Sequence, residues 1–262
     1  MGLKGIKMVD IHTHILPELD DGSRMLADSL EMAEIAVNSG VNILVATPHS
    51  NQQGRFENYF SPHLVERFHE MQTALERENI PLTLLLGMEI FASDDLKEKI
   101  KTRRLIGLND TQYFLVEFPF DAPPGYIAMC LDSILDEGKI PVIAHPERYY
   151  CAQQSPELVY DWLQMGCLTQ INKGSLFGRF GRGEQRLAEM MLEYDLATCA
   201  ATDAHSSQAR TTFMGDAKEY LDGTYGAETT QRLLTDNPLR ILQGLPVPSH
   251  GTRPERRRGF FR

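Results

Sequence analysis

Two short motifs place potential metal ligands two residues apart. His12 and His14 are separated by one residue, and Asp203 and His205 repeat this spacing near the other end of the chain. Residues two apart on an extended chain point to the same side, so the two members of each pair can reach one cation together. A single pair can equally be a structural feature satisfied by hydrogen bonds, but two such pairs favour metal coordination.

Two acidic residues stand beside apolar runs, where an unpaired charge is costly. Glu89 follows the run 82–88, and Glu117 lies between Val116 and Phe118. Either could belong to a structural ion pair, because a buried carboxylate must be paired or coordinated. Together with the histidines they favour coordination. A set of imidazole and carboxylate ligands without thiolate suits Mn²⁺, Fe or Zn²⁺, and its size implies two or three adjacent ions.

The elements that must position these residues alternate along the chain. Apolar, β-rich runs are separated by stretches of helical periodicity, seven times over. The predicted strands are residues 7–11, 42–47, 82–86, 113–116, 140–144, 168–171 and 196–200. This alternation favours a parallel sheet with helical crossovers. We therefore expect an α/β fold of one domain, a distorted (β/α)7 TIM-like barrel more than an open doubly wound sheet.

Helices are predicted between these strands. They cover residues 27–38, 62–79, 127–137, a segment opened by Ser155-Pro156, residues 212–221 and residues 228–242, the last broken by an Asn237-Pro238 cap. Residues 174–183, rich in glycine and arginine, are interpreted as a flexible loop after the sixth strand. Residues 1–243 are expected to form the barrel, and residues 244–262, with the basic cluster Arg256-Arg257-Arg258, a mobile tail.

Five histidines and four acidic residues fall at or just after the carboxyl ends of the predicted strands. Barrel enzymes carry their catalytic groups on this face, because the loops that follow the strands form its rim. The nine candidates are His12, His14, Asp21, His49, Glu89, Glu117, His145, Asp203 and His205. Their coincidence at one rim is the main sequence evidence for a metal-dependent enzyme.

Composition narrows the class of protein. Hydrophobic residues make up 42% and charged residues 24% of the 262 residues, which is ordinary for a globular protein, and the net charge of −10 argues against nucleic acid as the main partner. No secretory signal and no apolar run long enough for a membrane span is present, so no membrane insertion is expected. Four scattered cysteines without a CxxC pair are interpreted as reduced thiols of a cytoplasmic protein. None is followed six residues later by arginine, as a thiol phosphatase requires.

Longer motifs in the chain resemble a known family. From about Met8 to Leu242 the sequence resembles the polymerase-and-histidinol-phosphatase (PHP) metal-dependent phosphoesterases, and within them the bacterial tyrosine-protein phosphatases of capsule and exopolysaccharide loci. The matching segments are residues 9–17, Asp20-Asp21-Gly22, Thr47-Pro48-His49, residues 87–90, residues 115–118, residues 142–149 (VIAHPERY), residues 202–205 and Asp236-Asn237-Pro238. The Asp-Asp-Gly loop and the His-Pro-Glu-Arg-Tyr motif separate this branch from the polymerase-associated one.

The resemblance implies three divalent metal ions, with Mn²⁺ the expected metal and Fe or Zn²⁺ as alternatives. One ion would be held by His12, His14, Glu89 and Asp203, a second by Glu89 as a bridge with Glu117 and His145, and a third by Asp21, His49 and His205. The choice of Asp21 over the adjacent Asp20 follows the alignment of the motif. Arg148 and Arg210 lie on rim loops and can bind phosphate, and the resemblance supports a catalytic role for both, although each could instead form a surface ion pair. By its position on the rim loop after His49, and not by the resemblance, Arg55 is expected to add to substrate binding.

The expected reaction is hydrolysis of phosphotyrosine by metal-activated hydroxide. By family analogy the substrate is a phosphotyrosine-bearing protein, namely a tyrosine kinase of capsule or exopolysaccharide assembly. Three alternatives stay open: the same metal site acting on a small phosphomonoester such as histidinol phosphate, a hydrolase of C–N bonds, and a metal-loaded binding module without turnover. The sequence leaves the native metal and the oligomeric state open.

Overall fold

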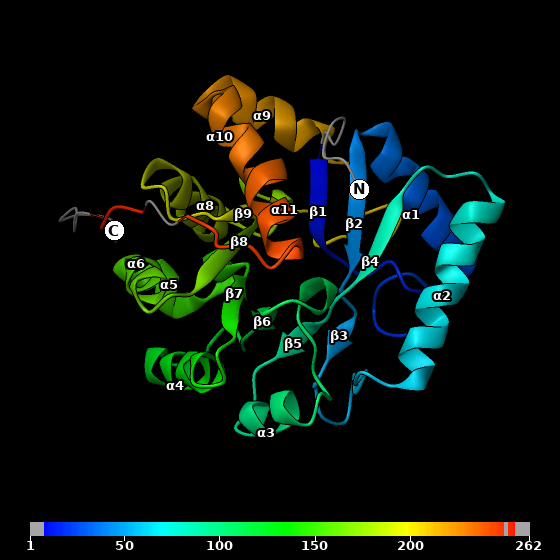
Figure 1. Ribbon diagram of the computed structural model, residues 1–262. Coiled ribbons are helices and arrows are strands. Elements are labelled where there is room, and N and C mark those ends of the chain that lie inside the picture. The colour runs from blue at the N-terminus through cyan, green and yellow to red at the C-terminus, as the bar shows by residue number, and fades with distance from the viewer. Residues whose placement is uncertain (1–7, 249–250, 255–262) are drawn as a thin grey trace.

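The computed structural model describes residues 8–248 and 251–254, and in it all the named strands pair in parallel. The strands are β1 (Met8–Thr13), β2 (Val41–Ala46), β3 (His49–Ser50), β4 (Thr83–Leu86), β5 (Glu89–Phe91), β6 (Tyr113–Glu117), β7 (Ile140–Ala144), β8 (Leu168–Asn172) and β9 (Cys199–Ala201). One sheet has the order β1-β2-β4, and the other the order β3-β5-β6-β7-β8-β9 (Figure 1). Every residue of β1 and β8 is buried, as expected of parallel strands covered on both faces.

Two short strands beyond the seven predicted ones, β3 and β5, follow β2 and β4 closely and bring the number of strands in the described residues to nine. Residues 47–48 separate β2 from β3, and residues 87–88 separate β4 from β5. Pro48 has no N–H to donate to a sheet, and Gly87 lies where a Cβ would come within 2.8 Å of Leu108. The interruptions place His49 and Glu89 at the first positions of β3 and β5, where the two residues are paired in register.

Hydrogen bonds also join the segment after β9 to β1, at the far ends of the two sheets. The N–H of His14 donates to the carbonyl of Ala204 at 2.9 Å, and the N–H of Asp203 donates to the carbonyl of His12 at 2.9 Å. The buried carboxylate of Asp10 on β1 accepts from the backbone N–H and the hydroxyl of Thr202. Strand β1 and the segment after β9 are thus joined by hydrogen bonds close to the carboxyl ends of the strands, where the candidate ligands lie.

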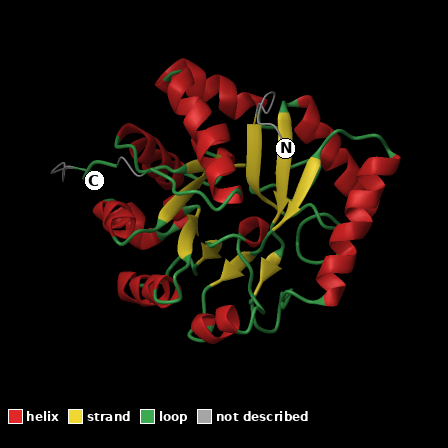
Figure 2. Cartoon of the chain, in the orientation of Figure 1, coloured by secondary structure: helices red, strands yellow, loops and turns green. Residues whose placement is uncertain are grey.

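Helices surround the strands (Figure 2). They are α1 (Leu26–Asn38), α2 (Pro62–Arg77), α3 (Leu96–Lys101), α4 (Pro124–Leu135), α5 (Tyr150–Gln154), α6 (Glu157–Gln164), α7 (Lys173–Leu176), α8 (Arg182–Glu193), α9 (Gly215–Tyr225), α10 (Ala227–Gln231) and α11 (Asn237–Leu242), with short 3-10 turns η1 (Leu108–Asp110) and η2 (Pro146–Arg148) and a π-helical segment η3 (Arg232–Asp236). Ser61 is the N-cap of α2, since its side chain accepts from the N–H of Leu64. The structure confirms a mixed α/β fold of one domain with parallel sheets.

Two helical predictions need correction. Residues 174–183 are not a loop throughout, because α7 includes residues 174–176 and α8 begins at Arg182. Asn237-Pro238 does not break the last helix: the π-helical turn η3 precedes it and the backbone at Asn237 stays helical. A π-helical turn lets a helix accept a residue that lacks an N–H donor. The short helix α3 and the amphipathic helix α8 were not predicted at all.

An inner cluster of apolar side chains lies on one face of the strands. It takes alternate residues from successive strands, such as Val9 and Ile11 on β1 and Val142 and Ala144 on β7. Alternate residues of a strand share one face. Ile241 from α11 belongs to the same cluster. A larger cluster lies between the strands and the outer helices. The interior is therefore a packed core, and the candidate ligands lie at its edge, at the carboxyl ends of the strands.

The described residues beyond α11 contact the domain. The side chain of Gln112 donates to the carbonyl of Gly244 at 3.0 Å, and the Tyr113 hydroxyl donates to that of Leu245 at 2.7 Å. The N–H of Thr252 donates to the carbonyl of Tyr194. These contacts differ from the mobile tail expected from residue 244 onward. The basic cluster Arg256-Arg257-Arg258 lies outside the described residues.

Other expectations concern cysteines and membrane spans. All four cysteines are free thiols, as predicted. Among the described residues, none of the helices has both the length and the apolar composition needed to cross a membrane.

Candidate metal centre

The nine predicted ligands come together at the carboxyl ends of the strands. His12 lies on β1, and His14 and Asp21 follow it. His49, Glu89 and Glu117 lie on β3, β5 and β6, while His145 follows β7 and Asp203 and His205 follow β9. Seven of the nine form three overlapping groups whose ligand atoms lie within 4.8 Å of one another: His14 with Asp21, His49 and His205; His12 with His14 and Glu89; and His49 with Glu89 and Glu117.

His12 and His14 are held with their Nε2 atoms facing each other. His12 Nδ1 lies 2.8 Å from Gln170 Oε1, while the amide nitrogen of Gln170 donates to Asn172 Oδ1 and the carbonyl of Ile171. His14 Nδ1 lies 2.7 Å from the carboxylate of Asp20. Both Nδ1 atoms therefore act as donors, and the lone pairs of the two Nε2 atoms, 3.3 Å apart, point into one space. Two facing lone pairs suit a cation and little else.

Glu89 lies at the centre of the cluster. Its Oε1 is 3.2 Å from His12 Nε2 and 3.0 Å from His145 Nε2, and its Oε2 is 3.2 Å from His14 Nε2 and 2.9 Å from His49 Nδ1. The side chain is 1% exposed, and in the described structure its Oε2 accepts no hydrogen bond. One carboxylate thus faces four imidazoles, which is the geometry expected of a bridging ligand.

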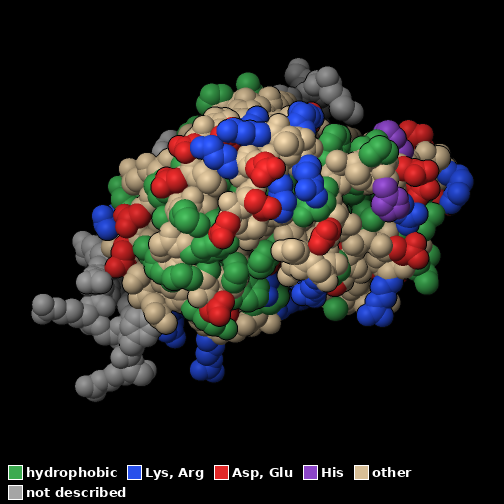
Figure 3. Space-filling view, turned by 90° about the horizontal axis from the view of Figure 1, so that it is seen from below, with side chains coloured by type: hydrophobic (Ala, Val, Ile, Leu, Met, Phe, Trp, Pro, Cys, Tyr) green, Lys and Arg blue, Asp and Glu red, His purple; other side chains and the backbone are tan. Residues whose placement is uncertain are grey.

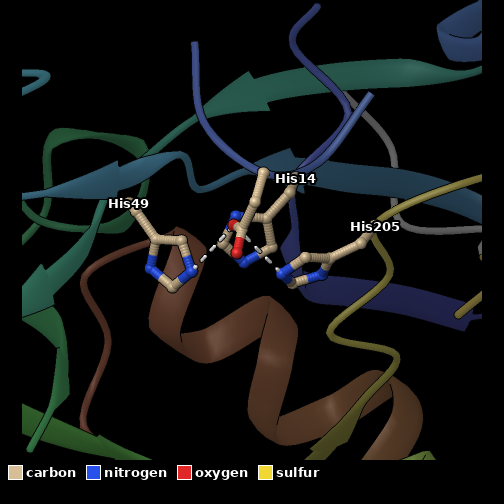
Figure 4. Close-up of side chains that lie close together, drawn as sticks. His14, His49 and His205 are labelled. Carbon is tan, nitrogen blue, oxygen red and sulfur yellow. Dashed lines mark ion pairs between the residues drawn. The ribbon is translucent and has the colours of Figure 1, made fainter. Parts of the chain in front are cut away.

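Asp21 joins two histidines at the outer side of the cluster. Its Oδ1 is 3.3 Å from His49 Nε2 and 3.6 Å from His205 Nε2. Figure 4 shows the rings of His14, His49 and His205 converging, with dashed lines for the two ion pairs to Asp21. The neighbouring Asp20 instead faces His14 Nδ1, away from the centre.

His145 and Asp203 complete the site from a constrained backbone. Both adopt positive φ, 35° and 50°, which is unusual for residues with a side chain and often marks a functional site. His145 Nε2 is 3.7 Å from Glu117 Oε1, and Asp203 Oδ1 is 3.5 Å from the Nε2 atoms of both His12 and His14. These two residues lie just outside the three close groups, although each contacts members of them.

The electrostatics of the cluster fit divalent cations. Burial and the neighbouring Glu89 carboxylate raise the pKa of Glu117 to about 8, so negative charge is crowded beyond what the histidines neutralise. Burial and the nearby His14 lower the pKa of His205 to about 3, which keeps this imidazole neutral and able to coordinate. His145 Nδ1 is likewise buried without a hydrogen-bond partner among the described residues. Unpaired buried polar atoms of this kind call for an ion.

A cavity of about 270 Å³ opens above the cluster. The three arginines proposed from the sequence, Arg55, Arg148 and Arg210, all line it, together with aromatic residues that include Phe91 and Phe120. Arg210 forms an ion pair with Asp203 Oδ2, whereas Arg148 reaches the same oxygen only at 3.8 Å. The outer face of the molecule seen in Figure 3 mixes acidic, basic and hydrophobic side chains. Five members of the cluster are buried, namely His12, His14, Glu89, His145 and Asp203, whereas the Asp21 side chain is 44% exposed.

Arg55 differs from the other two arginines. Its side chain is 59% exposed, its guanidinium lies 4.8 Å from the ring of Phe56, and it pairs with Asp21 at 3.4 Å. The Phe56 ring in turn stacks on His49, with centroids 5.5 Å apart and planes 8° apart. Arg55 therefore stands at the outer wall of the cavity and not beside Asp203.

Sequence reasoning missed the residues that orient the ligands. Within the predicted strand 168–171, Gln170 is the one amide side chain beside two apolar residues and a threonine, and this is the signal that could identify it. Glu147 was recognised only as part of a motif. Its Oε1 accepts from the N–H of Asn172 at 2.8 Å and from the hydroxyl of Ser175 at 2.7 Å, so it fixes the turn that carries His145 and Arg148. Asp20 was considered only as an alternative ligand.

Comparison with known proteins shows that the chain is similar to tyrosine-protein phosphatases along most of its length. A family model described as capsular polysaccharide synthesis, CpsB/CapC, matches residues 8–243. The tyrosine-protein phosphatase YwqE of Bacillus subtilis (strain 168) is 37% identical over 255 residues, which cover 97% of this chain and 99% of the relative. The tyrosine-protein phosphatase CpsB of Streptococcus agalactiae is 32% identical over 243 residues, covering 90% of this chain and 98% of the relative.

Solved structures agree with the sequence comparison. A chain from the crystal structures of YwqE from Bacillus subtilis and CpsB from Streptococcus pneumoniae, described as unique metal-dependent tyrosine phosphatases, has a TM-score of 0.88 at 37% identity and covers 95% of this chain and 100% of its own. An amidohydrolase from Mycoplasma synoviae has a TM-score of 0.58 at 11% identity, covering 92% of this chain and 89% of its own. The second likeness concerns the fold alone.

Proposed function

The chain belongs to the capsular polysaccharide synthesis CpsB/CapC family, and from this premise we propose that it is a metal-dependent phosphatase that hydrolyses phosphotyrosine in proteins. The observation that carries the proposal is the largely buried cluster of five histidines and four carboxylates beneath a cavity lined by arginines. Relatives along nearly the whole length are tyrosine phosphatases, and one structural relative is described as metal-dependent.

We propose three divalent ions, with Mn²⁺ as the metal and Fe or Zn²⁺ as alternatives. Three overlapping groups of ligand atoms support this number, and the absence of thiolate supports these metals. His12, His14, Glu89 and Asp203 would hold one ion, and Glu89, Glu117 and His145 a second. Asp21, His49 and His205 would hold the third, with His14 close to it. Bound divalent ions supply charge neutralisation for the phosphate dianion and an activated water nucleophile.

The side chains above the cluster would bind and orient the phosphate. Arg148 and Arg210 converge on Asp203, so that their guanidinium groups face the floor of the cavity from one side. Guanidinium groups bind phosphate oxygens through paired N–H donors and stabilise charge that develops during transfer. Phe120 lines the same cavity and offers an apolar wall for a tyrosine ring. Arg55, at the outer edge, would contact the substrate farther from the phosphate.

Two finer points extend the proposal. The substrate would be a phosphotyrosine-bearing protein, namely a tyrosine kinase of capsule or exopolysaccharide assembly, because the family is defined by capsular polysaccharide synthesis.

The two sheets would form one distorted seven-stranded barrel, with β2 and β3, and β4 and β5, each counted as one interrupted strand. The hydrogen bonds between His14 and Ala204 and between Asp203 and His12 support this closure.

Steady-state hydrolysis with the metal-stripped protein reconstituted with Mn²⁺ tests the function. A phosphotyrosyl peptide, a phosphoseryl peptide and histidinol phosphate are compared. We expect turnover of the phosphotyrosyl peptide well above the other two. Preference for histidinol phosphate would support the proposed metal site but refute phosphotyrosine as the substrate. Bound metal without phosphate release from any substrate would refute the phosphatase proposal.

Paired variants tie the activity to the cluster. His12→Ala/His14→Ala removes two ligands from β1, and we expect loss of both metal and activity. His63→Ala/His69→Ala is the matched control, because these two histidines lie exposed on α2, away from the cluster. The control variant should keep the metal content and turnover of the original protein.

A further inference from the structure

Phe180 lies between the two arginines of the proposed phosphate site. Its ring is 4.6 Å from the guanidinium carbon of Arg148 and 5.6 Å from that of Arg210. Arg148 also lies over the ring of Phe120, with its guanidinium carbon 4.2 Å from the ring centroid. Phe120 lines the cavity, whereas in the described structure Phe180 does not, so Phe180 contacts the arginines without being part of the cavity wall.

The two arginines differ in how firmly charged groups hold them. Arg210 pairs with Asp203 Oδ2, and its Nε donates to the carbonyl of Asp203 at 3.1 Å. Among the described residues, the one ion pair of Arg148 is that with the same carboxylate, at 3.8 Å. An ion pair of that length restrains the orientation of the guanidinium group only weakly. The rings of Phe120 and Phe180 are therefore the main groups that hold the guanidinium plane of Arg148.

The segment that carries Phe180 is itself fixed at both sides. The ring lies against the backbone of Gly174 on α7, where an added Cβ would come within 2.6 Å of ring carbon Cε2. The preceding Arg179 donates from its guanidinium to the carbonyl of Ala209 at 3.1 Å, in the loop that leads to Arg210. The N–H of Arg179 donates to the carbonyl of Gly174. Segment 177–181 therefore connects α7 to the Arg210 loop.

We propose that Phe180 is a positioning residue that holds Arg148 and Arg210 in the orientation that binds the substrate phosphate. Cations over an aromatic face are stabilised by the ring quadrupole, and the ring also limits the rotamers open to the two long side chains. Pre-oriented guanidinium groups lose less conformational freedom when phosphate binds. The inference rests on the proposed phosphatase function, because it assigns the two arginines to phosphate.

The first test measures phosphotyrosyl-peptide hydrolysis by the metal-loaded full chain with Phe180→Ala, Phe180→Leu and Phe180→Tyr. Loss of the aromatic face should lower kcat/KM about 3- to 30-fold in the Ala and Leu variants, and the inhibition constant of inorganic phosphate should rise with KM. Phe180→Tyr keeps the face and should stay within about twofold. Metal content should be unchanged in all three, because Phe180 contacts none of the proposed ligands.

Phe177→Ala is the matched control. Phe177 lies on the same segment, is 38% exposed and contacts the ring of Tyr220 at 5.8 Å instead of an arginine. This variant should keep the kinetics of the original protein. If Phe177→Ala loses as much activity as Phe180→Ala, the segment matters only for folding and the positioning role is refuted. Phe180→Leu keeps a bulky apolar side chain, so it separates loss of packing from loss of the aromatic face.

A double-mutant cycle with Gly174 gives a second test. Gly174→Ala should push the ring away from the arginines and lower phosphate affinity in the same direction as Phe180→Ala. In the Phe180→Ala background the added methyl group meets no ring, so the second substitution should cost almost nothing further. Additive losses would show that Gly174 acts independently of Phe180 and would overturn the proposed arrangement.

Phosphate binding separates this inference from the proposed function. Calorimetric titration of inorganic phosphate into the metal-loaded protein needs no turnover. Unchanged phosphate affinity in Phe180→Ala refutes the positioning role even if phosphotyrosine hydrolysis is confirmed. Weaker phosphate binding in this variant, in a protein that hydrolyses no phosphotyrosyl peptide, supports the positioning role and refutes only the choice of substrate.

Discussion

Asp20 Oδ2 lies 2.7 Å from His14 Nδ1, and both side chains are fully buried. The same carboxylate oxygen accepts a hydrogen bond from the N–H of His49 at 2.8 Å, and Asp20 Oδ1 accepts one from the N–H of Gly22 at 2.9 Å. Asp20 thus fixes the ring of His14 and joins the loop after β1 to β3. Its neighbour Asp21 points the other way, toward His49 Nε2 and His205.

The two adjacent aspartates should therefore respond differently to substitution. Asp20→Asn keeps the shape but removes the anionic acceptor, so metal affinity should fall about 10- to 100-fold, with activity recovered at high Mn²⁺. Asp21→Asn should remove one equivalent of bound metal, and added Mn²⁺ should restore little activity. Metal titration followed by elemental analysis distinguishes the two. Equal loss of one metal equivalent in both variants would contradict these roles.

Removal of metal should destabilise the protein. The ligands crowd negative charge in a buried space, and an ion that binds only the folded state stabilises it by about 2.7 kcal/mol at a concentration of 100 times its Kd. Chelation should therefore lower Tm by about 5–10 °C. Differential scanning calorimetry with and without chelator measures the shift. The His12→Ala/His14→Ala variant should show a much smaller shift, and an equal one would place the stabilising ion elsewhere.

Arg210 should contribute to stability as well as to phosphate binding. Asp203 is 2% exposed, and Arg210 is the cation paired with its Oδ2. Arg210→Ala leaves this carboxylate without that partner and should cost about 2 kcal/mol in the metal-free protein, a figure reduced for the partial exposure of Arg210. Metal binding should shrink the loss, because an ion beside Asp203 replaces the missing charge. Urea unfolding in both states tests this.

Arg148 should affect catalysis more than stability. Its ion pair with Asp203 is long, and its side chain is 20% exposed. Arg148→Lys keeps the charge but loses the planar pair of donors, so kcat/KM for a phosphotyrosyl peptide should fall at least about tenfold with little change in Tm. Arg186→Lys on α8, at an exposed position, is the control for replacement of an arginine. An unchanged kcat/KM in Arg148→Lys would remove this residue from the phosphate site.

The segment after α11 should stabilise the domain from the side opposite the metal centre. The hydroxyl of the buried Tyr113 donates to the carbonyl of Leu245 at 2.7 Å. Tyr113→Phe removes this hydrogen bond and should cost about 1 kcal/mol, with kcat/KM unchanged. A chain ended at Gln243 should lose at least as much stability, because the hydroxyl then has no carbonyl to bind. Thermal unfolding of both variants, with turnover as the control, checks the prediction.

Local pattern determined where the strands end and which residues stand there. Apolar runs with β-rich composition predicted β7 with its observed bounds, and predicted β6 and β8 to within one residue. Burial and side-chain alternation act over a few residues, so such runs can be recognised without knowledge of the fold. The placement of His12, His14, Glu89 and Asp203 at one rim followed from the strand ends and from the parallel arrangement.

Tertiary structure alone decided the contacts made across the chain. Gln170 orients His12 although 158 residues separate them, and Phe180 packs on arginines from two other loops. Asp20 and Asp21 have the same chemistry and adjacent positions, so only the path of their loop directs one to His14 Nδ1 and the other to His49 Nε2. A side chain's direction in a loop depends on partners distant in sequence, and no local periodicity encodes it.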